Sequence, residues 1–332
     1  MLNSFLFRSA DIFYPDGPPA DPDRLPDLKP QQVREIEAIF AATVDGLKKL
    51  HTQQKDALSG VFEYPVPDSL KTRFTLTNTG QPYARIDPKG DITIDVKVAQ
   101  AIYRTALLSG LKDESVGGFR FMDWDKENLG KRATTEAEHI EQFLRLKQRV
   151  VALPGRTMIG DFAGILKDDG FKGGWHEMAD IGMISVTVER HYFGPIQFLL
   201  AHELGHSALG HLEKRKSIAD DNCEALQDME LEADAYASFL LSSAMAKSGL
   251  LGFDFFGIKD SIGFEDFFKY TYELSGFEQT AGAKTCGHPP IGDRLKVVEA
   301  IYKAIQEAAQ ENTAKLMDRM MEEAIAKERG SQ

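Results

Sequence analysis

Two short motifs most constrain how this chain can fold. Residues 202–206 read His-Glu-Leu-Gly-His, and residues 230–234 read Glu-Leu-Glu-Ala-Asp. On an α-helix, which turns about 100° per residue, positions four apart lie on one face. Each motif would therefore present two polar side chains from one helix face, provided that both segments are helical.

The residues around both motifs predict helices. Gly194-Pro195 is typical of a helix entry, and the mostly apolar residues 196–201 lead directly into His202. Residues 228–241 are amphipathic, and their apolar surface consists of Leu231, Ala235, Phe239 and Leu240.

Two histidines at this spacing are typical of a metal site in which His202 and His206 are ligands and Glu203 stands beside the open coordination position. A catalytic zinc ion has three protein ligands and keeps a fourth place for water. We predict Zn²⁺ as the cofactor and Glu230 as the third ligand, with Glu232 as the alternative.

Asp234 favours Glu230 over Glu232. It lies one turn beyond Glu230 on the same face, where it could accept a hydrogen bond from the non-ligating nitrogen of His202. Such a bond fixes the tautomer of a metal-binding histidine. Only Glu230 would then supply a ligand and its supporting carboxylate from one face of the helix.

The two motifs together resemble those of the gluzincin metallopeptidases, and three details resemble the CAAX prenyl endopeptidases and their soluble bacterial relatives. These details are His211, which extends the first motif, the Glu-x-x-x-Asp pattern at 230–234, and Gly-His-Pro-Pro at 287–290 followed by Arg294. The likeness spans about residues 193 to 300. The ImmA/IrrE-type peptidases and the Lit-type phage-exclusion peptidases are similar over the same region. About the first 150 residues show no such resemblance.

The resemblance implies a zincin-like fold and hydrolysis of peptide bonds, with Glu203 and His288 as catalytic residues. Zinc would lower the pKa of its water to about 7 and polarise the scissile carbonyl, while Glu203 would pass the water proton to the leaving amine. The candidates for an oxyanion donor are His288, Arg294, Tyr236 and Tyr270, and we also count Arg294 among the substrate-binding residues. The alternative for His288 is a turn that starts a helix.

Two other functions stay open at this point. The same ligands could join two helices in a non-catalytic zinc scaffold, although such a scaffold would not need Glu203. The protein could also be a regulatory peptidase, triggered by stress or phage, with a single cellular target. The N-terminal half would then serve as its sensor or latch.

The composition limits the class of protein. With 42% hydrophobic and 27% charged residues, the 332-residue chain is typical of a soluble globular protein, and it contains no run of 18 apolar residues that would span a membrane. The net charge of −12 argues against nucleic-acid binding. We therefore expect a protein or peptide substrate as the partner, and the oligomeric state is left open.

The cysteines and the N-terminus favour a cytoplasmic location. Cys223 and Cys286 are too few for a disulfide framework, and the first residues lack the basic and apolar regions of a secretion signal. Cys286 and His288 could form a second metal site, although an incidental cysteine is the more common case.

The expected fold class is α+β. We expect a mixed α/β region of unknown role at 1–154 and a zincin-like metallopeptidase domain with a mostly helical C-terminal part at 155–332, divided at Leu153-Pro-Gly155. Apolar residues between 33 and 50 recur at helical spacing, and a hairpin is expected at 83–96 around the turn 87–90. Further helices are expected at 97–108, 135–153, 264–274 and 291–327.

Residues 182–189, which read Gly-Met-Ile-Ser-Val-Thr-Val-Glu, alternate and are rich in β-branched side chains. This pattern predicts a strand just before the first motif. An extended substrate could add to the free edge of such a strand through main-chain hydrogen bonds, so we predict that Ser185, Val186 and Thr187 bind substrate. The alternative is an ordinary edge strand without a ligand.

Overall fold

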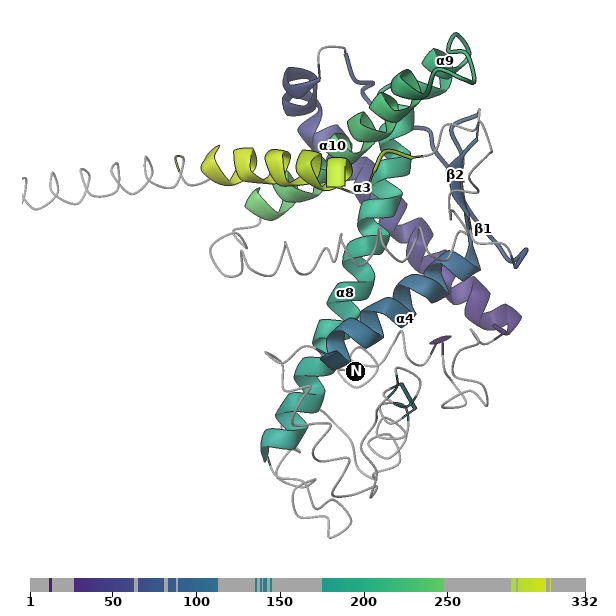
Figure 1. Ribbon diagram of the computed structural model, residues 1–332, viewed down its shortest axis with the longest axis vertical. Coiled ribbons are helices and arrows are strands. Elements are labelled where there is room, and N and C mark those ends of the chain that lie inside the picture. Colours follow the sequence, from purple (N-terminus) through teal and green to yellow (C-terminus); the bar gives the residue numbers. More distant parts are fainter. Residues whose placement is uncertain are drawn as a thin grey trace, which may run out of the picture. The chain divides into compact units, whose positions relative to one another are not determined.

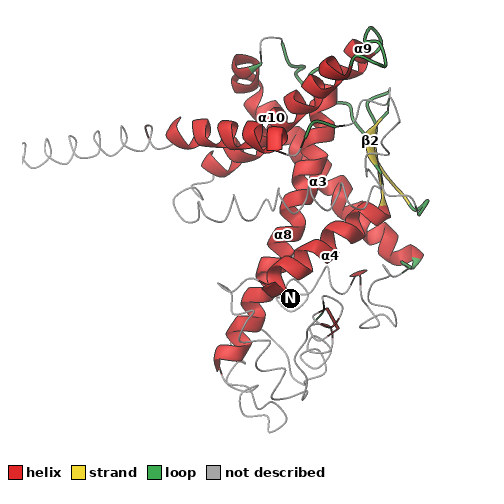
Figure 2. Cartoon of the chain, in the orientation of Figure 1, coloured by secondary structure: helices red, strands yellow, loops and turns green. Residues whose placement is uncertain are grey.

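The computed structural model describes residues 12–13, 27–62, 65–80, 83–87, 89–112, 135, 138, 140–141, 144, 175–247, 288–290, 292–308 and 311. These residues form mainly helices with a small sheet (Figure 2), in agreement with the α+β class.

The chain divides into two compact units. The first, here called the sheet unit, comprises 1–43, 73–197 and 257–283, and the second, the motif unit, comprises 44–72, 198–256 and 284–332. Each unit takes segments from both sides of residue 155. The boundary expected at Leu153-Pro-Gly155 itself lies outside the described residues.

Among its described residues, the sheet unit contains three strands and one complete helix, labelled in Figure 1 where there is room. These elements are β1 (Phe74–Thr77), β2 (Ala84–Ile86), β3 (Ile92–Asp95) and α4 (Val96–Lys112). Two long helices, α3 (Pro30–Val61) and α8 (Trp175–Ala208), contribute residues to both units.

The sheet has the strand order β1-β3-β2, with β1 parallel and β2 antiparallel to β3. The β2–β3 hairpin confirms the prediction. In its turn, Oδ1 of Asp87 accepts the backbone N–H groups of Lys89 and Asp91, and Gly90 has a φ of 84°, which glycine adopts without a steric penalty. β1 was not predicted, because four residues with one buried side chain carry almost no alternation.

The helices predicted at 33–50 and 97–108 are confirmed as parts of α3 and α4. α4 follows β3 directly, where Oδ1 of Asp95 accepts the backbone N–H of Lys97, a typical capping contact. The buried stripe of α3 includes Ile36, Phe40, Val44 and Leu47.

The strand predicted at 182–189 is wrong, because this segment lies within α8. The buried residues Val188, Tyr192 and Ile196 follow one another at intervals of four, which is the periodicity of a helix face. Packing of this face overrides the strand preference of β-branched residues, which depends strongly on context. α8 also runs through Pro195 instead of beginning there.

The helix removes the basis for the substrate binding predicted at Ser185, Val186 and Thr187. All three lie in α8, where main-chain N–H and C=O groups bond to one another along the helix. A peptide cannot add to a strand edge at these residues, so that mode of binding is corrected.

The motif unit contains parts of α3 and α8 together with α9 (His211–Arg215), α10 (Cys223–Lys247) and the helical residues 292–308. α8 ends at Ala208, and Gly210, with a φ of 67°, leads into α9. The helix predicted across 228–241 is confirmed within α10, and residues 292–308 agree with the helix predicted at 291–327. The helix predicted at 264–274 and most of the one at 135–153 lie outside the described residues.

Two further observations concern the whole described chain. Within it, no helix combines the length and the apolar character needed to cross a membrane. Cys223, the first residue of α10, is disulfide-bonded, which a count of two cysteines did not predict. Cys286 lies outside the described residues.

Candidate metal centre

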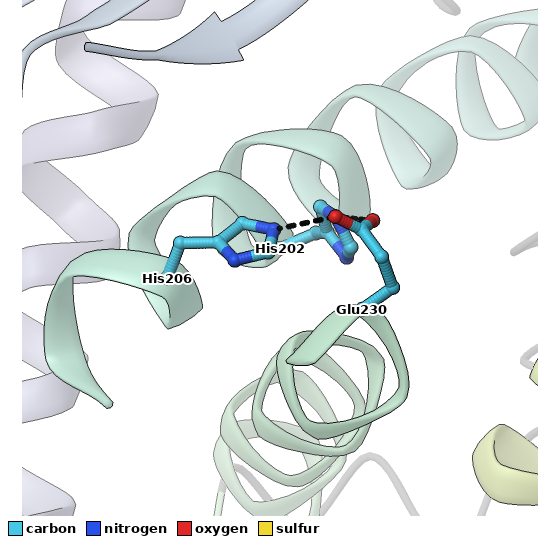
Figure 3. Close-up of side chains that lie close together, drawn as sticks. All are labelled: His202, His206 and Glu230. Atoms are coloured by element: carbon cyan, nitrogen blue, oxygen red, sulfur yellow. Dashed lines mark hydrogen bonds and ion pairs between the residues drawn. The ribbon is translucent and has the colours of Figure 1, made fainter. Parts of the chain in front are cut away.

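Three side chains from α8 and α10 converge on one point in the motif unit (Figure 3). Nε2 of His202 lies 3.2 Å from Nε2 of His206. Glu230 reaches both histidines, with Oε2 at 3.3 Å from Nε2 of His202 and Oε1 at 3.5 Å from Nε2 of His206. These three residues could hold a metal ion, and they are the set expected from the sequence.

A glycine in the first motif allows the two helices to approach this closely. A Cβ atom on Gly205 would lie 3.1 Å from Cδ1 of Tyr236 and 3.2 Å from the backbone of Ala233. A side chain here would therefore press against α10. The sequence signal was a glycine inside an otherwise helical pattern, which often marks a close approach.

A carboxylate supports the first histidine, as predicted. Nδ1 of His202 lies 2.9 Å from Oδ1 of the fully buried Asp234. Because a carboxylate only accepts hydrogen bonds, Nδ1 carries the proton, and Nε2 is directed toward the other ligand atoms.

Arg294 in turn holds Asp234. Its Nε donates to Oδ2 at 2.6 Å and its Nη2 to Oδ1 at 2.7 Å, and both side chains are buried. A guanidinium and a carboxylate form this two-point contact with fixed geometry. The structure thus assigns Arg294 a supporting role, which differs from the substrate contact expected for it.

The second histidine is supported from α9. Nδ1 of His206 lies 2.9 Å from Nδ1 of His211, and Nε2 of His211 donates to Oε2 of Glu232 at 2.9 Å. Glu232 is therefore engaged with His211, while Glu230 is the glutamate beside the histidines. His211 makes structural hydrogen bonds, as the sequence indicated.

His288 reaches the glutamate of the cluster. Its Nδ1 donates to Oε2 of Glu230 at 2.8 Å, and its side chain is 41% exposed. The backbone N–H of Asp293 bonds to the carbonyl of Pro290, which starts the helix at 292–308. His288 thus precedes a helix start and also contacts Glu230, while its catalytic role stays a prediction.

The ionisation of the cluster reflects its burial and its hydrogen bonds. Burial lowers the pKa of His202, but its contacts with Asp234 and Glu230 raise it more strongly, to about 10. Burial and the neighbouring His202 lower the pKa of His206 to about 3. Although burial raises the pKa of Glu230, hydrogen bonds with His202 and His288 hold it well below the ordinary value. Without a metal, a protonated His202 therefore lies between two carboxylates.

Glu203 is buried directly beside the first ligand. Burial raises the pKa of Glu203 to about 7, against the opposing effect of His202. No hydrogen-bond partner of this carboxyl group occurs among the described residues. Near neutral pH, Glu203 can therefore accept a proton and also release one.

Tyr236 does not fit the role of an oxyanion donor. Its ring is fully buried, and its hydroxyl lies 2.8 Å from Nδ1 of His51. Nε2 of His51 donates to the carbonyl of Pro67 at 2.7 Å, so a neutral His51 accepts at Nδ1 and the Tyr236 hydroxyl donates to it. Tyr270 lies outside the described residues. The sequence carried no signal for His51, a single histidine on an amphipathic helix.

Comparisons with protein-family models, with curated proteins and with solved structures found no match to this chain. The function is therefore inferred from the side chains of the centre itself.

Proposed function

We propose that this protein is a zinc-dependent metallopeptidase of the gluzincin type, with a zincin-like catalytic domain, that hydrolyses peptide bonds in a protein or peptide. One observation carries the proposal: the atoms of His202, His206 and Glu230 converge from two helices, with the buried carboxyl group of Glu203 beside them. The resemblance of the two motifs to soluble relatives of the CAAX prenyl endopeptidases supports the same function.

The distances between the three side chains suit zinc. Tetrahedral zinc with bonds of about 2.0–2.1 Å to nitrogen and oxygen keeps its ligand atoms about 3.3–3.4 Å apart. The two imidazole nitrogens lie 3.2 Å apart, close to this spacing. The two oxygens of Glu230 lie one beside each histidine, with Oε2 at 3.3 Å from Nε2 of His202 and Oε1 at 3.5 Å from Nε2 of His206. Two imidazoles and one carboxylate form a common catalytic zinc set, which leaves one position open.

The surrounding residues would perform the chemistry as follows. When bound, zinc supplies a lowered water pKa of about 7 and polarisation of a carbonyl group. Glu203 accepts the proton of the attacking water and donates it to the leaving amine. Asp234 and Arg294 orient His202, and His288 holds Glu230 by its hydrogen bond.

Substitution of Glu203 tests the proposal. Glu203→Gln is nearly isosteric and removes the proton acceptor without removing a ligand, so it should retain zinc and lose hydrolysis. Proteome-wide labelling of new N-termini, in cells with the wild-type chain or with Glu203→Gln, would identify the substrate. Equal cleavage by both chains would overturn the proposed mechanism.

The same experiment separates the other functions. New termini in a single protein would indicate a regulatory peptidase with one target. Stoichiometric zinc in both chains, with no new termini from either, would indicate a zinc scaffold instead.

A further inference from the structure

The two histidines of the centre are supported in different ways. His202 contacts the buried carboxylate of Asp234 within α10, whereas His206 contacts His211 in α9. His211 is buried, but the chain of contacts continues to Glu232, whose side chain is 38% exposed, and to Lys214, which is 41% exposed. The support of His206 therefore ends at the protein surface.

The contacts determine where the protons lie. The carboxylate of Glu232 can only accept, so Nε2 of His211 carries a proton. A neutral His211 then has an unprotonated Nδ1, which accepts a hydrogen bond from the Nδ1–H group of His206, 2.9 Å away. His206 is left with a free electron pair on Nε2, the atom that lies beside His202 and Glu230.

We propose that His211 and Glu232 are positioning residues that fix the metal-binding tautomer of His206. Glu232 accepts the hydrogen bond from Nε2 of His211, so Nδ1 of His211 is the acceptor for Nδ1–H of His206. The partly exposed carboxylate thereby fixes which nitrogen of the ligand carries the proton. The inference rests on the metal site of the proposed function. Groups that orient a metal-binding histidine typically change metal affinity by about 10- to 100-fold.

Variants of His211 test the contact with His206. Titration of the full chain with zinc against a competing chelator would give the affinity of each variant. His211→Phe keeps a ring but removes the acceptor, so zinc affinity should fall by about 10- to 100-fold. His211→Asn places a carbonyl oxygen near the position of Nδ1 and should restore most of the affinity.

Variants of Glu232 test the direction of the two hydrogen bonds that link His206, His211 and Glu232, without changing a buried side chain. Glu232→Gln can still accept from Nε2 of His211 and should change zinc affinity little. Glu232→Lys presents a donor and should lower the affinity clearly more. Glu213→Lys is the matched control, because it makes the same charge change at an exposed residue that pairs with Lys216.

A spectroscopic measurement separates tautomer control from packing. In the metal-free chain, nitrogen-15 NMR of labelled histidine should show the proton of His206 on Nδ1 in wild type and on Nε2 in a larger share of Glu232→Lys molecules. Equal zinc affinities in wild type, His211→Phe and Glu232→Lys, together with the same His206 tautomer in wild type and Glu232→Lys, would overturn the inference. A wild-type chain that binds no zinc would instead overturn the proposed function.

Discussion

At the scale of single residues, Asp234 serves two partners at once. Oδ1 lies beside both His202 and Nη2 of Arg294, while Oδ2 accepts from Nε of Arg294. A carboxylate satisfies all three donors. An amide has one accepting oxygen, so an asparagine here would turn its NH₂ group toward either a histidine or a guanidinium donor.

Substitution of Asp234 should therefore affect both metal binding and folding. If His202 were the only partner, Asp234→Asn would be less harmful than Asp234→Ala, because an amide oxygen still accepts a hydrogen bond, but the contact with Arg294 makes it costly. We expect Asp234→Ala and Asp234→Asn both to lower zinc affinity by about 10- to 100-fold. We also expect both to lower the free energy of unfolding by about 3–5 kcal/mol, because a buried arginine loses its partner. Chelator titration and urea unfolding would measure these effects.

An exposed carboxylate provides the control for Asp234. Asp293→Asn removes an ion pair with Lys296 at the surface, and we expect its unfolding free energy to stay within about 0.5 kcal/mol of wild type. An Asp234→Asn chain as stable as Asp293→Asn would contradict the assigned role.

Zinc binding should tighten as the pH rises. Since the pKa of His202 is raised to about 10, its Nε2 is protonated across the neutral range, and a metal ion must displace this proton. One competing proton makes the apparent affinity rise by about tenfold per pH unit from about pH 6 to 9. Isothermal titration calorimetry at several pH values, corrected for proton uptake by the buffer, would measure how steeply the zinc affinity rises with pH. This rise should be shallower in Asp234→Ala. A flat profile in wild type would show that no proton is displaced.

At the scale of secondary-structure elements, the packing of α8 on α10 determines the spacing of the centre. We expect Gly205→Ala to destabilise the chain, because its Cβ would lie 3.1 Å from the Tyr236 ring. Overpacking of this kind costs about 1–3 kcal/mol, which exceeds the gain of about 1 kcal/mol from replacing glycine in a helix. Zinc affinity should fall as well, since α8 would move away from Glu230.

Gly46→Ala is the matched control for this substitution. Gly46 also lies within a helix, α3, but no heavy atom outside the local backbone lies within 4 Å of an added Cβ. Alanine there should stabilise the chain by up to about 1 kcal/mol. If Gly205→Ala were equally stabilising, the close approach of the two helices would not limit the site.

At the scale of the whole molecule, the metal should contribute to stability. Its ligands belong to α8 and α10, so an ion that binds only the folded chain shifts the unfolding equilibrium. Zinc at about 100 times its dissociation constant should stabilise the chain by about 2.7 kcal/mol. Thermal unfolding with zinc, with magnesium, and with zinc plus a chelator would measure this. The same unfolding midpoint with zinc, with magnesium, and with zinc plus a chelator would argue against a metal site.

His206→Ala is the control for metal-dependent stability, since it removes one of the three ligands. Its unfolding midpoint should not respond to zinc. Magnesium should have no effect on either chain, because it prefers six oxygen ligands.

Patterns within single segments were enough to predict several parts of this protein. The spacing of His202 and His206, the apolar stripe of α3 and the β2–β3 hairpin each depend on residues that are neighbours along one helix or one turn. The geometry of a helix also made Glu230 and Asp234 a pair, so the sequence alone indicated the set of three side chains that the structure brings together.

Contacts between distant segments decided the rest. The strand preference at 182–189 gave way to α8, because the burial of Val188, Tyr192 and Ile196 depends on neighbours that the local pattern does not contain. Asp234, Glu232 and His51, the partners of Arg294, His211 and Tyr236, lie 60, 21 and 185 residues away in the chain. Hydrogen bonds require atoms about 3 Å apart, and only the packed chain brings these side chains to such distances.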